Sequence, residues 1–87
     1  MNRNEEIMTV LGEECAEVIV ELSKVKRFGM TEENVARLKK EMSDLQCMLN
    51  LMEEFTVVTY RPTEKISLMA QKREKLKKFS TIFESNS

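Results

Sequence analysis

Residues that interrupt regular backbone structure are almost absent from this chain, which has only two Gly and one Pro among 87 residues. Because Gly and Pro are the strongest local breaks, their scarcity predicts helix along most of the sequence. Gly29 directly follows Lys26, Arg27 and Phe28, an order typical of a helix end, and Thr31 before two glutamates is typical of a helix start. We therefore expect three helices, over about 4–28, 31–55 and 63–83. The stretch "TVVTYRP" between the last two is expected to be a loop or a short extended link, and the terminal "ESNS" is expected to fray.

Composition narrows the chemistry that the chain can perform. It contains no His, which excludes a Ser-His-Asp triad, a Cys-His pair and His metal ligands, and we therefore expect either carboxylate chemistry or no catalysis. Cys15 and Cys47 both fall inside predicted helices without metal-type spacing, which indicates a reduced, cytoplasmic protein. No apolar run is long enough for a membrane span, and the polar start "MNRNEEIM" is unlike a secretory signal.

Charge is distributed unevenly along the chain. The net charge of -1 gives no reason to expect a nucleic-acid partner. Residues 1–63 carry 12 Asp and Glu against 8 Lys and Arg, whereas residues 64–87 carry 3 against 6. An acidic body with a basic end predicts either a self-complementary assembly or a site that handles both cations and anions.

The second predicted helix has a regular apolar seam in alternating steps of three and four, formed by Val35, Leu38, Met42, Leu45, Leu49 and Met52. Its far side carries Lys39, Lys40, Ser43, Gln46, Asn50 and Glu54. Glu41 and Asp44 do not join that far side, because at 100° per residue they share a sector with Met48, Leu51 and Phe55. This apolar trio is expected to pack in the core, with a base pocket as its alternative role.

The first helix repeats this pattern at an offset of 27 residues. Its seam is Leu11, Cys15, Val18 and Leu22, and Glu14, Glu17 and Glu21 lie beside it. Each helix thus presents a pair of acids, three residues apart, at the edge of a helix–helix interface. A small chain of this kind leaves much apolar surface open, so we expect two long antiparallel helices plus a third, assembled as a homodimer or dimer of dimers around a four-helix bundle.

Four carboxylates beside an apolar interface would repel one another and be poorly solvated. A divalent cation removes both problems, and Mg²⁺ prefers oxygen ligands at about 2.0–2.1 Å. The opposed acid pairs therefore predict a Mg²⁺ site, with Mn²⁺ as a possible substitute, formed by Glu14, Glu17, Glu41 and Asp44. The alternative is that these acids are solvated surface charge.

"EECAE" at 13–17 and "EMSD" at 41–44 resemble the E-E-x-x-E and E-x-x-D signature of the all-α nucleoside triphosphate pyrophosphohydrolases, the MazG-like superfamily. The resemblance covers roughly residues 8–55 and is closest to the small phage-type members. It implies one all-α domain over 1–87 that hydrolyses a (d)NTP to the monophosphate and pyrophosphate, in the host cytoplasm if phage-encoded. It also implies catalytic carboxylates at the four ligand positions, with Glu13 as an accessory carboxylate.

Several residues around this signature keep two interpretations. Arg37 either holds substrate phosphates or pairs with Glu41, and Glu21 either supports the site from behind or is an ordinary solvated or salt-bridged glutamate. Within "QKREKLKK" at 71–78, Lys72 and Lys75 are the candidates for phosphate binding, against a solvated basic helix face. For the whole chain, the alternatives are a non-enzymatic helical interaction module and a phosphoribosyl-ATP pyrophosphohydrolase-like activity.

Overall fold

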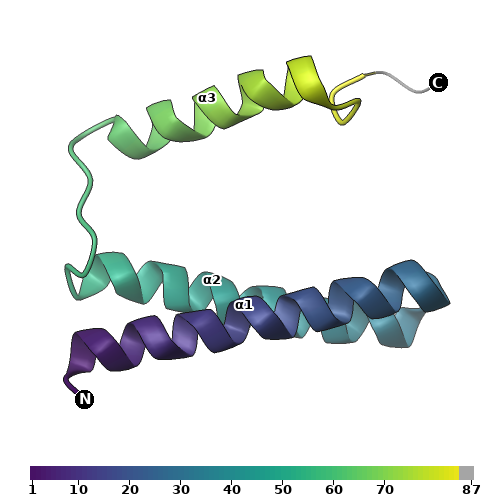
Figure 1. Cartoon of the computed structure of the whole chain (residues 1–87), viewed down its shortest axis with the longest axis horizontal. Helices are drawn as coiled ribbons and strands as arrows, with labels where there is room; N and C mark the ends of the chain where they lie inside the picture. The colour runs from purple at the N-terminus through teal and green to yellow at the C-terminus, as the bar shows by residue number, and fades with distance from the viewer. Residues whose placement is uncertain (85–87) are drawn as a thin grey trace.

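The computed structural model describes residues 1–84, and within them the chain forms three helices and no strand. These are α1 (Arg3–Phe28), α2 (Glu32–Glu54) and α3 (Glu64–Phe79) (Figure 1). The all-α prediction is confirmed, and of the terminal "ESNS", which is expected to fray, residues 85–87 lie outside the described part of the chain. In the described part of the chain, no helix combines the length and apolar character needed to cross a membrane.

The ends of the first two helices are set by the side chains that the sequence predicts. The N–H of Asn34 donates to Thr31 Oγ1 over 3.1 Å, which confirms Thr31 as the cap of α2. Gly29 ends α1 with φ 93°, a conformation that side chains disfavour, and its N–H donates to the Val25 carbonyl over 2.8 Å. Asn2 caps α1 by accepting from the Glu5 N–H over 2.8 Å, so α1 begins one residue earlier than expected.

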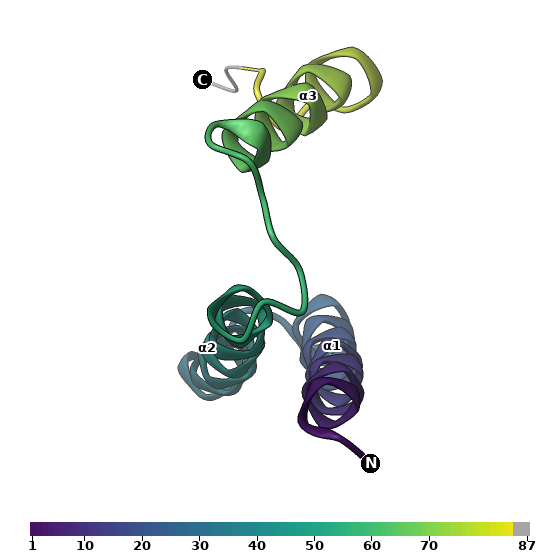
Figure 2. The same ribbon diagram turned by 90° about the vertical axis from the view of Figure 1, so that its left-hand side faces the viewer.

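Helices α1 and α2 form an antiparallel hairpin through the short connection at 29–31 (Figures 1 and 2). Their mutual interface uses part of the predicted seam, with these seam positions half-buried: Leu11, Val18, Val35, Leu38, Leu45 and Met52. The buried residues of the pair are Ile7, Glu21 and Asn34, and a half-buried line continues through Glu14 and Glu41. The acids thus lie in the packing line between the helices. The seam positions Cys15, Leu22, Met42 and Leu49 instead lie on an exposed face.

Helix α3 stands away from the hairpin at the end of the 55–63 connection (Figure 2). Within residues 1–84, only α1 and α2 pack against each other, and none of the α3 residues is buried. The connection is a loop, with Thr56 and Thr63 at positive φ. The third helix ends at Phe79, four residues short of its predicted end, because Ser80 is extended and its hydroxyl donates to the Leu76 carbonyl over 2.6 Å.

Candidate metal centre

Three of the four predicted metal ligands meet between α1 and α2. Glu14, Glu41 and Asp44 each offer a carboxylate oxygen, and these oxygens all lie within 4.8 Å of one another. Glu14 lies seven residues from both Ile7 and Glu21, which are the buried residues of α1. Residues seven apart share one side of a helix, so Glu14 is on the face that α1 turns to α2. On α2, Glu41 and Asp44 are three residues apart and therefore project on the same side.

Glu17 does not belong to this group of oxygens and is exposed. On α1, the three-residue step of about 60° carries Glu17 from the packing line to the exposed side, whereas on α2 the same step leaves both Glu41 and Asp44 half-buried. Glu17 is nevertheless close enough to Glu14 for its charge to raise the pKa of Glu14. Glu13 is exposed on α1 and also lies outside the group. The predicted four-ligand set is thus a three-carboxylate cluster with Glu17 at its margin.

Glu14 is the electrostatically unfavourable member of the cluster. Its Oε2 atom is shielded from solvent and has no hydrogen-bond donor among the described residues. Desolvation raises the pKa of the Glu14 carboxyl above its ordinary value, and the charges of Asp44, Glu41 and Glu17 raise it further. A buried carboxylate oxygen without a donor, facing two other carboxylates, is a position where a bound cation would relieve both defects.

Lys40 supplies a positive charge at the cluster, although its helical angle points to the far side of α2. Its Nζ atom is 2.8 Å from Asp44 Oδ2 and 3.7 Å from Glu41 Oε1, because the long side chain reaches along the helix to the acids. The hydrogen bond to Asp44 raises the pKa of Lys40 above its ordinary value. The i,i+4 spacing of Lys40 and Asp44 is the signal that could have predicted this contact.

The donor set fits a hard divalent cation. In an octahedral Mg²⁺ site with bonds of about 2.1 Å, neighbouring ligand oxygens are about 3 Å apart and opposite ones about 4.2 Å. Oxygens within 4.8 Å of one another need only small side-chain rotations to reach such a shell. The Lys40 side chain is 70 % exposed, so it can withdraw into solvent when a cation replaces it.

Arg37 and Glu21 form an ion network that adjoins this cluster on the same two helices. Arg37 donates to Glu33 Oε1 over 2.7 Å and to Asn34 Oδ1 over 2.9 Å, and its Nε atom lies 3.8 Å from Glu21 Oε2. The partners of Arg37 in the described chain are therefore these residues rather than Glu41. Glu21 is salt-bridged and buried, with Lys24 as its second partner at 3.3 Å.

The structure brings neither Lys72 nor Lys75 to the carboxylate cluster, because both are exposed on the separate helix α3. The trio Met48, Leu51 and Phe55 is half-buried at α2 and its C-terminal end, in agreement with core packing, and Arg3 lies over the Phe55 ring at 4.2 Å.

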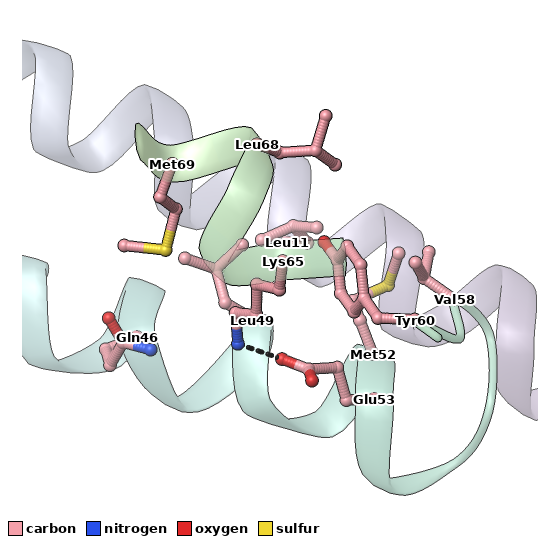
Figure 3. A pocket seen from close by; sticks show the side chains of 10 residues that line it. All are labelled: Leu11, Gln46, Leu49, Met52, Glu53, Val58, Tyr60, Lys65, Leu68 and Met69. Carbon is pink, nitrogen blue, oxygen red and sulfur yellow. Dashed lines mark hydrogen bonds and ion pairs between the residues drawn. The ribbon is translucent and has the colours of Figure 1, made fainter. Parts of the chain in front are cut away.

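A hollow of about 460 Å³, which no feature of the sequence predicts, lies between the hairpin and the start of α3 (Figure 3). Its lining is mostly apolar, and a Lys65–Glu53 ion pair of 2.5 Å closes one side. The lining comes from the hairpin, the 55–63 connection and α3, and it comprises Leu11, Gln46, Leu49, Met52, Glu53, Val58, Tyr60, Lys65, Leu68 and Met69. Local pattern cannot reveal such a hollow, because it depends on how the 55–63 connection positions α3.

No protein-family model, curated protein or solved structure matches this chain.

Proposed function

We propose that this chain is a Mg²⁺-dependent nucleoside triphosphate pyrophosphohydrolase, which converts a (d)NTP to the monophosphate and pyrophosphate. The observation that carries the proposal is the convergence of Glu14, Glu41 and Asp44 from two helices, with the Glu14 Oε2 atom buried and without a donor. The resemblance of "EECAE" and "EMSD" to the MazG-like signature adds the reaction type to this geometry.

In the proposed site, Glu14, Glu41 and Asp44 would hold Mg²⁺, and Glu17 would add negative charge at the margin of the group. The ion would supply neutralisation of the triphosphate and a bound water of lowered pKa. Lys40 would leave Asp44 when the ion binds, which frees its ammonium group for substrate phosphates beside the same cluster. Arg37 would reach phosphate by exchanging its contact with the exposed Glu33 carboxylate, while Glu21 and Asn34 keep it in place.

We also propose that the enzyme works as a homo-oligomer in which two hairpins form a four-helix bundle. The exposed apolar positions Cys15, Leu22, Met42 and Leu49 support this, because they continue the predicted seam on the free side of the hairpin. A cytoplasmic location, and the host cytoplasm for a phage-encoded chain, stay predictions of the sequence.

Glu41→Gln tests the assignment with almost no change of shape. Loss of one ligand charge should reduce Mg²⁺-dependent pyrophosphate release by about 100-fold or more, since even groups that only support a ligand often contribute 10–100-fold. Glu54→Gln, at the exposed end of the same helix, should retain full activity. Circular dichroism should show equal helicity in both variants. Full activity of Glu41→Gln would exclude the proposed site.

A non-enzymatic helical interaction module is the second candidate, and the extent of exposed apolar surface favours it. Thermal melts separate the two. Saturable stabilisation by Mg²⁺ together with a non-hydrolysable nucleotide supports the enzyme, whereas no shift supports the module. Including phosphoribosyl-ATP in a panel of nucleotides assayed for pyrophosphate release tests the related activity.

A further inference from the structure

A single copy of this chain exposes more surface, and has a larger radius of gyration, than a compact monomer of its size. It exposes 7204 Å² of surface, whereas a compact monomer of its mass, 10.2 kDa, exposes about 5,300 Å². Its radius of gyration is 16.0 Å, against about 12 Å for a compact chain of 87 residues. The excess is about 1,900 Å² per copy, or about 3,800 Å² for two copies, and this total lies in the range of about 2,000–5,000 Å² that obligate homodimers bury.

Part of the exposed apolar surface lies on two faces, one on the hairpin and one on α3, that border the hollow of Figure 3. On the hairpin, Met42 is 54 % exposed and Leu49 is 43 % exposed. On α3, Ile66 is 72 % exposed and Met69 is 61 % exposed. Figure 3 shows Met69 and Leu49 lining the same hollow from opposite sides, so the two faces border one space.

The same two elements are complementary in charge. Residues 1–63, which include the hairpin, carry an excess of acids, whereas α3 carries two acids against six bases. Within one copy, only the Lys65–Glu53 ion pair joins α3 to the hairpin among the described residues. The other basic residues of α3 are exposed beside an acidic hairpin that they do not contact.

We propose that a second copy of this chain fills the space between α3 and the α1–α2 hairpin, so that each α3 closes over the other copy's hairpin. In a dimer with a two-fold axis, the hairpin of each copy would be covered by α3 of the other copy, so both apolar faces would be buried in the same interface. The apolar face of α3 becomes buried on the partner's hairpin, and its basic residues come close to the partner's acids. This deepens the homo-oligomer part of the proposed function and uses none of the proposed metal ligands.

Sedimentation of the full chain tests the arrangement with a matched pair of variants on α3. The wild-type chain should be a dimer. Met69→Glu puts a charge into the proposed interface and should raise the dimer dissociation constant by about 100-fold. Gln71→Glu adds the same charge to the same helix, away from the hollow, and should leave the dimer intact. A monomeric wild-type chain, or equal dissociation constants for the two variants, would overturn the proposal.

A second measurement uses the wild-type sequence and so does not depend on a variant's folding. Isotopically light and heavy chains are refolded together, and lysines are joined to neighbouring carboxylates by a zero-length cross-linker. Peptides that join the central lysines of α3 to hairpin acids should include pairs of one light and one heavy partner, while Lys65–Glu53 provides the within-chain reference. Finding only same-label pairs contradicts the exchange of α3.

The two proposals fail independently. A dimer with the cross-links described, but without pyrophosphate release, removes the proposed function and leaves the α3 exchange in place. A monomer that releases pyrophosphate would remove the α3 exchange and leave the proposed activity in place.

Discussion

Glu14 combines a buried carboxylate oxygen that lacks a hydrogen-bond donor within residues 1–84, a feature it shares with Glu21, with close repulsion from neighbouring acids. Desolvation, and then the neighbouring acids, raise the pKa of its carboxyl. Ionising this carboxyl therefore costs more free energy in the folded, metal-free protein than in the unfolded chain. Below its ordinary pKa of 4.5 the group is neutral in both states and contributes no penalty. As the pH rises through the ordinary value and then the raised one, the folded state loses stability relative to the unfolded state.

Glu14→Gln should therefore increase the free energy of unfolding of the metal-free protein at neutral pH but not below the ordinary glutamate pKa. Urea unfolding in the presence of a chelator, at fixed chain concentration, measures this. Glu13→Gln, at the exposed neighbouring position, is the control and should show little change. A Glu14→Gln variant that is less stable than wild type at neutral pH would contradict the electrostatic account of this residue.

Lys40 provides a second prediction at the same scale, because it contacts two of the carboxylates that a cation would need. Lys40→Met removes this competitor and should tighten Mg²⁺ binding about two- to five-fold, the range expected for an exposed ion pair. Lys39→Met changes the net charge equally, at an exposed position beside it, and should have a smaller effect. Isothermal titration of Mg²⁺ without nucleotide distinguishes them, and weaker binding by Lys40→Met would count against displacement of the lysine.

At the scale of the helices, capping chemistry made the boundaries predictable, whereas the choice of interface was not. Thr31 and Gly29 act locally, so the ends of α1 and α2 agree with the sequence to within a residue. Each of these helices, however, carries two adjacent apolar sectors. Periodicity alone does not decide which residues pack within the chain, and the structure places Glu14 and Glu41 in the half-buried interface together with part of the predicted seam.

The third helix shows the same limit of local pattern. Phe83 continues the apolar spacing of α3, yet the helix ends at Phe79, since the Ser80 hydroxyl bonds back to the Leu76 carbonyl. Phe83 instead lies under the Arg73 guanidinium, 4.5 Å from it. In the candidate site, the convergence of acids from α1 and α2 was predictable, but the exposure of Glu17 and the reach of Lys40 depend on side-chain geometry that spacing does not specify.

The two glycines allow one substitution to be tested with opposite expected signs. Gly12 lies inside α1, where an added Cβ would meet no atom within 4 Å, so Gly12→Ala should stabilise the protein by about 1 kcal/mol. Gly29 ends α1 at φ +93°, so Gly29→Ala should destabilise it by about 1 kcal/mol. Urea unfolding at one chain concentration measures both. Destabilisation by Gly12→Ala would indicate a close approach to that position in the assembled protein.

For the whole molecule, the proposed assembly predicts that folding and association are coupled. Ile7 is the one buried hydrophobic residue among residues 1–84, so a single copy has little core of its own. Packing against a second copy would supply the missing burial, and it explains why the predicted seam is only partly used within one chain.

The melting temperature should therefore rise with protein concentration, because association stabilises the folded state by mass action. Met69→Glu should flatten this dependence, whereas Gln71→Glu should preserve it. Scanning calorimetry over a range of concentrations provides the comparison. A wild-type melting temperature that does not change with concentration would contradict coupled folding and assembly.

The central functional claim is that carboxylates from two helices share one divalent ion. A crystal structure grown with Mn²⁺ in place of Mg²⁺ tests it most directly, since anomalous scattering identifies the metal independently of its ligands. We predict a Mn²⁺ peak bonded to oxygens of Glu14, Glu41 and Asp44, with the Lys40 ammonium group displaced from Asp44. Mn²⁺ bound only elsewhere, with Lys40 still bridging Asp44 and Glu41, would contradict the account.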